Sequence, residues 1–122
     1  MLTAVVKVGK EAFKMELINN ATSRSLLEQL PLSIEFSDFG GLEKIFYPPN
    51  KLSKDGAPAG AKPTKGDVMC YSPWGNIAIF YKDASYASGL IPMGKIENVD
   101  SFHKSLIKGE KAIITPNQVL LS

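Results

Sequence analysis

The sequence has very little cysteine, arginine, histidine or tryptophan, because each occurs once in 122 residues. The single Cys70 excludes an internal disulfide and is typical of a reducing compartment, so we expect a cytoplasmic protein. The net charge is only +2 and no dense basic run is present, which argues against a nucleic-acid partner. Long apolar runs are also missing, and the opening MLTAVVKVGK is predicted to be neither a signal peptide nor a membrane span.

Motifs that carry chemistry are scarce as well. No phosphate-binding glycine loop, Ser-His-Asp set or zinc-ligand spacing appears in the sequence. The only histidine, His103, has no Asp, Glu or Cys at ligand spacing, so we expect it at the boundary of the core and predict no metal and no cofactor. Cys70 shares the parity of Val68 in a strand-like run, which predicts a buried thiol and not a nucleophile.

The residues that are present indicate one mainly β domain over residues 1–122. Hydrophobic residues make up 44% and charged residues 21% of the chain, close to the averages for a globular protein. Apolar residues alternate with polar ones in many short runs. These patterns predict strands at 2–8, 11–18, 67–72, 76–83, 89–97 and 111–115, with an extension at 118–121, a hairpin over 32–49, and helices within 19–31 and 98–109.

Local signals set the boundaries of these elements. Asn20 or Thr22 is predicted to cap the first helix, and Asn98 or Asp100 the second. The hairpins are expected to bend at Gly9-Lys10 and at Gly40-Gly41. Pro92 interrupts a strand, so that position is predicted to be an edge or a bulge.

Eight short alternating strands with only two helices predict a closed antiparallel barrel, since closure removes exposed strand edges. Side chains fill the interior of a barrel of this size, so a ligand must bind outside it or at a mouth. The segment 48–66 has no periodicity and holds four lysines and four prolines. A structureless loop of this length is commonly functional or mobile, and we predict a mobile flap beside the binding groove.

Several stretches resemble cyclophilins. MGKIENVDSF is similar to the strand, glycine-lysine and helix start near the cyclophilin C-terminus, and GDVMCYS followed by NIAIFY is similar to the paired central strands. More closely, LLEQLPLSIEFSDFGGLEK, GDVMCYSPWGNIAIFYKD and GLIPMGKIE resemble the small bacterial and archaeal cyclophilin-like proteins, a family with the same fold and no settled function. The resemblance covers nearly the whole chain and implies an eight-stranded cyclophilin-like barrel.

The resemblance to cyclophilins proper raises the question of peptidyl-prolyl cis-trans isomerase activity. In cyclophilins an arginine on the third strand donates to the prolyl nitrogen as its amide conjugation breaks. Residues 32–47 contain no arginine, and their only cation, Lys44, is a flexible and strongly hydrated substitute. The only arginine, Arg24, lies in the first expected helix. We therefore predict a non-catalytic binding module, with weak isomerase activity through Lys44 or Arg24 as the alternative.

Three aromatic residues are candidates for ligand contact. Trp74 stands in a turn between two strands, where it either seals one end of the core or anchors a ligand in a groove. Phe80 has the parity opposite to the two preceding isoleucines, so it either floors an external pocket, as the matching cyclophilin phenylalanine does, or packs beneath a helix. Tyr86 either lies at the edge of the pocket or is simply an exposed residue of a loop.

Glu43 is the fourth candidate ligand residue. With Lys44 it forms either a solvated hairpin pair or part of the ligand contact. Asp38 with Glu35 or Glu43 is a weak candidate for an acid/base pair, since nothing in the sequence sets their separation. The expected partner is a small molecule or an extended peptide, and a homodimer is a further alternative if Pro92 and the last strand leave an open edge.

Overall fold

The computed structural model describes residues 2–107 and 109–116 of the chain. From the N-terminus the elements are β1 (Leu2–Val8), β2 (Glu11–Leu17), α1 (Ala21–Leu27), β3 (Leu32–Glu35), β4 (Ser37–Phe39), β5 (Glu43–Phe46), β6 (Gly60–Ala61), β7 (Asp67–Tyr71), β8 (Asn76–Phe80), β9 (Ala87–Ser88), β10 (Leu90–Ile96), α2 (Val99–Ser105) and β11 (Lys111–Pro116). Both predicted helices and the predicted strands are present in the expected order. The predicted extension at 118–121 lies outside the described residues.

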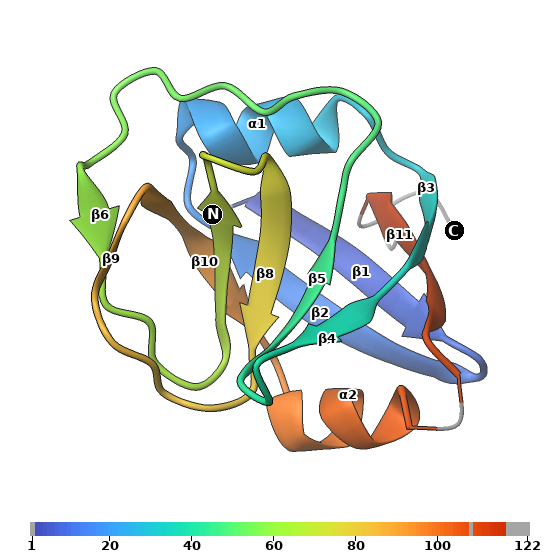
Figure 1. The fold of residues 1–122 in the computed structure, drawn as a ribbon. Coiled ribbons are helices and arrows are strands. Elements are labelled where there is room, and N and C mark those ends of the chain that lie inside the picture. The colour runs from blue at the N-terminus through green and yellow to red at the C-terminus, as the bar shows by residue number, and fades with distance from the viewer. Residues whose placement is uncertain (1, 108, 117–122) are drawn as a thin grey trace.

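Nine of the described strands form one antiparallel sheet that curls into a nearly closed barrel, with α1 and α2 at opposite ends (Figure 1). The strand order is β3-β11-β1-β2-β10-β7-β8-β5-β4. The two edge strands, β3 and β4, are consecutive in the chain and are separated only by Phe36. The mainly β barrel with two helices is confirmed. The prediction of eight strands in a fully closed barrel is wrong, because the sheet has nine strands and its edge strands β3 and β4 do not pair with each other. The gap between β3 and β4, here called the seam, is crossed by the chain at Phe36.

The seam arises because the predicted hairpin over 32–49 splits in two. Its second half is as expected, since β4 pairs with β5 across Gly40 and Gly41, which both have positive φ. Its first half, β3, pairs with β11 instead. At the bend, the Phe36 N–H donates to the Glu110 carbonyl at 2.8 Å, while the Phe36 ring is buried in the core.

The barrel interior is filled by side chains, as predicted. Phe102 of α2 packs edge-on against Phe13 and Phe36, with ring centroids 5.6 and 5.4 Å apart. Phe36 also meets Phe46 at 5.4 Å in the same geometry. Edge-to-face contacts of this kind are favourable beyond the burial of their area. The aromatic cluster therefore fastens α2, the seam and β5 to one another.

The two helices begin differently. Asn20 has an extended backbone, and its side-chain oxygen accepts from the Ser23 N–H at 2.8 Å, so the predicted cap of α1 is confirmed. Asn98 precedes α2 with a left-handed backbone, φ 52°, and makes no side-chain cap bond within the described part of the chain. Asn98 is thus the N-cap residue of α2, one of the two predicted, but its side chain makes no capping bond, because such a bond needs the extended backbone that Asn20 has.

Pro92 lies at a bulge, as predicted, because the register of β10 against β7 shifts between Pro92 and Gly94. Gly94 lies against β2 so closely that a Cβ atom there would be 2.0 Å from the Glu16 carbonyl oxygen. The expected open edge at these strands is wrong. In the sheet, β10 is paired with both β2 and β7, and β11 with both β1 and β3.

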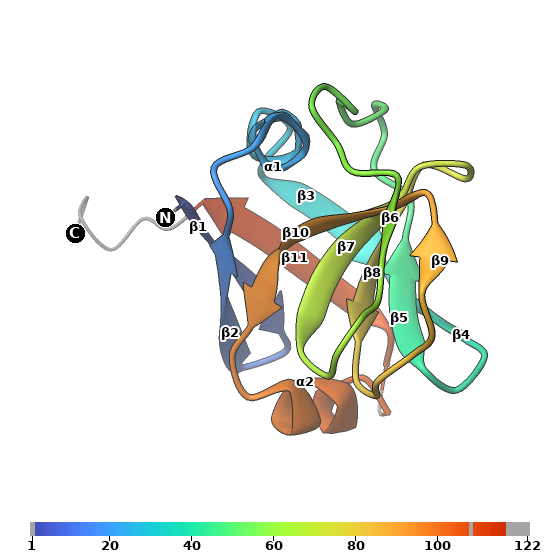
Figure 2. The same ribbon diagram turned by 90° about the vertical axis from the view of Figure 1, so that its left-hand side faces the viewer.

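The segment 48–66 forms a second layer outside the barrel, where its short strand β6 pairs with β9 (Figure 2). Its earlier part is fastened to α1, since the Thr22 hydroxyl donates to the Ser53 carbonyl at 2.6 Å. The Ser53 N–H donates to Ser25 Oγ at 2.9 Å, and Leu52 is buried in the core. These contacts place the segment against α1 and β9, and its mobility stays a prediction.

Candidate functional site

The outer face of the sheet carries a second, smaller apolar cluster. Its buried members are Ile45, Met69, Ala78, Phe80 and Leu90. Phe80 belongs to it, whereas Ile77 and Ile79 belong to the main core, so the opposite parity predicted for Phe80 is confirmed. In the described residues, the side chains packed against this cluster come from strands and loops and not from a helix. The cluster that contains Phe80 is therefore covered by the strand pair β6–β9 and the residues beside it.

A cavity of about 260 Å³, here called the outer pocket, opens beside this cluster. It is lined by Phe39, Glu43, Pro63, Tyr71, Trp74, Asn76, Phe80, Ala84, Ser85, Ala87 and Leu90. Three of the four predicted ligand residues, Glu43, Trp74 and Phe80, thus line one cavity. Tyr86 does not line it. Its side chain is 58% exposed and its hydroxyl lies directly over Gly60 of β6.

Aromatic rings form the wall of the outer pocket. The Trp74 ring lies edge-on to Phe39 at 5.4 Å and to Tyr71 at 5.3 Å. Trp74 is 51% and Phe39 45% exposed, so both rings present apolar surface to solvent. Trp74 is therefore a wall of an external pocket and not a plug over the core. Sequence reasoning missed Phe39, although a tight turn at Gly40-Gly41 pairs Phe39 directly with Glu43.

Glu43 and Lys44 point in opposite directions, so their predicted solvated pair is wrong. Glu43 is half-buried in the outer pocket, and within the described residues its carboxylate has no hydrogen bond or ion pair. Burial, and then the charge of Asp38, raise the pKa of Glu43 above its ordinary value. Lys44 is only 6% exposed, because its neighbour across β8 is the core residue Ile79. The alternation of a strand explains the separation.

Asn76 supplies a second unpartnered acceptor to the outer pocket. It is 1% exposed, and its Oδ1 atom accepts no hydrogen bond from the described residues. Its amide group reaches the Ile77 carbonyl only at 3.5 Å, which is a long contact. Buried polar atoms are nearly always paired in folded proteins. Asn76 therefore brings a buried, unpartnered acceptor to the lining of the outer pocket, and the sequence offered no signal for it.

A polar cluster lies at the α2 end of the barrel, on the other side of β5. Lys44 Nζ is 3.1 Å from Glu110 Oε1 and 3.7 Å from Asp38 Oδ1. The Tyr81 hydroxyl donates to Asp38, and the Tyr81 ring stacks on His103 with centroids 3.8 Å apart. His103 is half-buried, which confirms the predicted boundary position. Asp38 thus pairs with Lys44 and Tyr81, and not with another carboxylate as an acid/base pair.

This cluster shifts two pKa values. Burial, and then the hydrogen bond to Asp38 and its charge, raise the pKa of Tyr81 to about 12. Burial acts to raise the pKa of Asp38, but the hydrogen bonds from Tyr81 and the Gly41 N–H, with the charge of Lys44, lower it overall. The cluster therefore holds a neutral phenol beside an ionised Asp38 at neutral pH.

The two cations considered for prolyl isomerisation, Lys44 and Arg24, are both engaged by neighbouring groups. The Lys44 ammonium is engaged by Glu110 and Asp38. Arg24 lies on α1, where its guanidinium donates to the Asn19 side chain at 2.8 Å. Cys70 is buried as predicted, and burial raises the pKa of its thiol to about 11, so the thiolate nucleophile is disfavoured.

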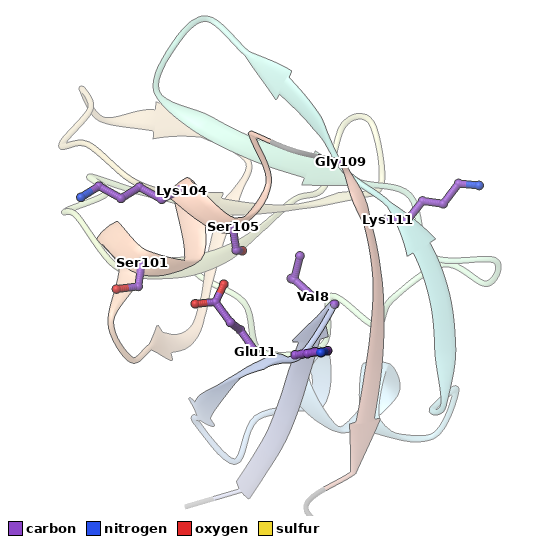
Figure 3. Close-up of a pocket in the computed structure, with 9 residues that line it drawn as sticks. Val8, Glu11, Ser101, Lys104, Ser105, Gly109 and Lys111 are labelled. Carbon is purple, nitrogen blue, oxygen red and sulfur yellow. The ribbon is translucent and has the colours of Figure 1, made fainter.

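A larger hollow of about 570 Å³ lies between the β1–β2 hairpin and α2 (Figure 3). Lys104 and Lys111 point away from each other, while Glu11 is turned toward Ser105 (Figure 3). The described lining contains no aromatic side chain. Because ligand sites are usually apolar with a few convergent polar groups, the outer pocket is the better candidate.

The described residues hold neither a candidate metal site nor a helix that could span a membrane. They contain no group of three or more His, Cys, Asp or Glu that is arranged to hold a metal ion. No helix among them is long and apolar enough to cross a membrane.

The fold and the sequence agree on the family. The chain belongs to the cyclophilin-like family, whose sequence pattern matches residues 6–115. The solution structure of a hypothetical protein from Archaeoglobus fulgidus is similar, with a TM-score of 0.68, 20% sequence identity and 94% of each chain covered. At that identity the likeness shows the fold alone. A search of curated proteins found no match. The resemblance seen in the sequence is thereby confirmed.

Proposed function

We propose that the protein is a non-catalytic binding module that holds a small molecule or an extended peptide in the outer pocket. The observation that carries the proposal is that Glu43, Trp74 and Phe80 line one cavity together with Phe39 and Tyr71. An apolar, aromatic cavity with few polar groups is the usual form of a ligand site. Exposed aromatic rings also supply large contact area at low entropic cost.

A peptide ligand is supported by the position of β4. This strand is an edge of the nine-stranded sheet, and its last residue, Phe39, lines the outer pocket. The residues of β4 are exposed. Extended peptides commonly add to such an edge through main-chain hydrogen bonds, while neighbouring pockets select their side chains.

Prolyl isomerisation is the less supported alternative. Among the described residues, no lysine or arginine lines the outer pocket, so no cationic donor faces a bound prolyl nitrogen. A protease-coupled proline-peptide assay tests the alternative. A rate above buffer that disappears in Lys44→Met or Arg24→Gln would overturn the non-catalytic assignment.

The binding proposal is tested by a ligand screen with backbone chemical-shift mapping. We expect perturbations within residues 39–47, 71–81 and 84–90 for any ligand that binds. Trp74→Ala should weaken binding at least tenfold, because it removes one wall of the pocket. Tyr86→Ala is the matched control, since it removes an exposed aromatic ring outside the pocket. Perturbations that cluster away from these ranges would overturn the assignment.

A further inference from the structure

We infer that the outer pocket selects a protonated amine carried on an apolar body, either a free arylalkylamine or the lysine side chain of an extended peptide. The inference deepens the proposed function and depends on it. The polar atoms of the pocket indicate the class of ligand. Within the described chain, neither the Glu43 carboxylate nor Asn76 Oδ1 receives a hydrogen bond. Both are acceptors, so the missing partner is a group that carries N–H or O–H donors.

The charge balance at the pocket favours a cation. Glu43 is the only charged side chain in the described lining. The charge of Asp38 disfavours the ionised form of Glu43, although the Asp38 side chain itself lies in the polar cluster on the other side of β5. Asp38 accepts from the Tyr81 hydroxyl and pairs with Lys44, whose ammonium lies in the polar cluster and not in the lining of the pocket. An anionic ligand would meet uncompensated negative charge, whereas a cation would relieve it.

The aromatic wall favours the same class of ligand. Cations bind over the faces of Trp, Tyr and Phe through the quadrupole of the ring. The Trp74 ring stands edge-on to Phe39 and to Tyr71, so its plane is turned from the planes of both neighbours. A carboxylate beside such rings both attracts an ammonium group and accepts its hydrogen bonds.

The dimensions of the pocket call for an elongated ligand. Glu43 pairs with Phe80 across β5 and β8, and Asn76 is four residues from Phe80 on the same face of β8. At about 3.3 Å per residue, the two ends are on the order of 13 Å apart. One ammonium group therefore cannot reach both acceptors. A lysine-containing peptide supplies the ammonium for Glu43 and backbone N–H groups for Asn76, while an arylalkylamine satisfies Glu43 and fills the aromatic stretch.

The test compares three compounds with one apolar body, namely phenylbutylamine, phenylbutanol and phenylbutyrate, by NMR titration of the full chain at neutral pH. We expect the amine to bind at least about tenfold more tightly than the alcohol, and the carboxylate to bind most weakly. Glu43→Gln should remove most of the advantage of the amine and leave the affinity for the alcohol unchanged. Glu35→Gln makes the same charge change on exposed β3 and should have no effect.

The two sources of amine are distinguished by a tripeptide with a central lysine and its norleucine counterpart. Tighter binding of the lysine peptide than of phenylbutylamine assigns the site to peptides, and the reverse assigns it to small amines. If the alcohol or the carboxylate binds as tightly as the amine or more tightly, the amine inference is overturned but the pocket assignment stays intact. The same conclusion follows if Glu35→Gln and Glu43→Gln change the affinity for the amine equally. If no compound perturbs the pocket residues, both the inference and the proposed function fall.

Discussion

Tyr81 makes the stability of the fold depend on pH in the alkaline range. Its side chain is buried, donates to Asp38 and stacks on His103. Burial, followed by the interactions with Asp38, raises its pKa from an ordinary 10.0 to about 12. Below pH 10 the tyrosine is neutral in both the folded and the unfolded chain, so its full contribution to the stability of the fold is present there. Its contribution is lost as the pH rises from about 10 through about 12, because the unfolded chain ionises first.

The size of the effect follows from the shift. Two pKa units at 1.36 kcal/mol each correspond to about 2.7 kcal/mol of unfolding free energy. Urea unfolding, followed by far-UV circular dichroism at pH 8, 10 and 11.5, measures it. Between pH 8 and 11.5 we expect the wild type to lose about 1.9 kcal/mol more than Tyr81→Phe, because the full effect of about 2.7 kcal/mol is reached only above pH 12. The difference between the two proteins cancels the deprotonation of the lysines, which both retain.

A matched control separates Tyr81 from the other tyrosines. Tyr47 is 58% exposed, so Tyr47→Phe should keep the alkaline loss of the wild type. At pH 8, Tyr81→Phe should itself be less stable by about 1–2 kcal/mol, because Asp38 loses a hydrogen bond. Parallel loss of stability in the wild type and Tyr81→Phe would refute the structural account of this cluster.

Four other predictions concern the outer pocket and the surface layer. Phe80→Ala should lower the unfolding free energy by about 3–5 kcal/mol, because the ring is buried, whereas Trp74→Ala should change it by less than about 1 kcal/mol in the same urea experiment. Asn76→Leu should be neutral or stabilising by up to about 1 kcal/mol, since it removes an unpaired buried oxygen, and a clear loss of stability would show that this oxygen is paired. Binding of phenylbutylamine should weaken as the pH falls through the raised pKa of Glu43, as the carboxylate is protonated, and titration calorimetry of Glu43→Gln should show no such dependence. Amide relaxation should show faster motion in 48–66 than in the sheet, and equal rigidity would contradict the flap.

Alternation along single strands was enough to predict part of the site. The parity of Phe80 against Ile77 and Ile79 placed its ring on the outer face, where the structure has it. The same rule applied to β5 would have sent Lys44 inward. Adjacent charges were instead interpreted as a solvated pair, and the true partner of Lys44, Glu110, is 66 residues away in the chain. Pairing over that distance leaves no local sequence signal.

The seam and the cover of the pocket could not be predicted for a related reason. Residues 32–37 alternate as one strand, and only the competing partners, β11 and β5, show that it breaks at Phe36. The cover comes from β6 and β9, which have two residues each and no periodicity to detect. Non-local pairing, and not intrinsic propensity, decides both features. The seam and the cover of the pocket are therefore apparent only in the assembled sheet.

Whether the protein forms a homodimer is a separate question that remains a prediction. The free edges of the sheet are β3 and β4, and not the strands expected from the sequence. Sedimentation velocity across protein concentration tests association. A mass that stays at one chain at every concentration would contradict the homodimer.

The central claim is that ligands enter the outer pocket, and intermolecular nuclear Overhauser effects with bound phenylbutylamine test it most directly. We expect contacts from the phenyl and methylene protons to Trp74, Phe39 and Phe80. Contacts to Val8 and Ser101, in the hollow between the β1–β2 hairpin and α2, would instead contradict the account.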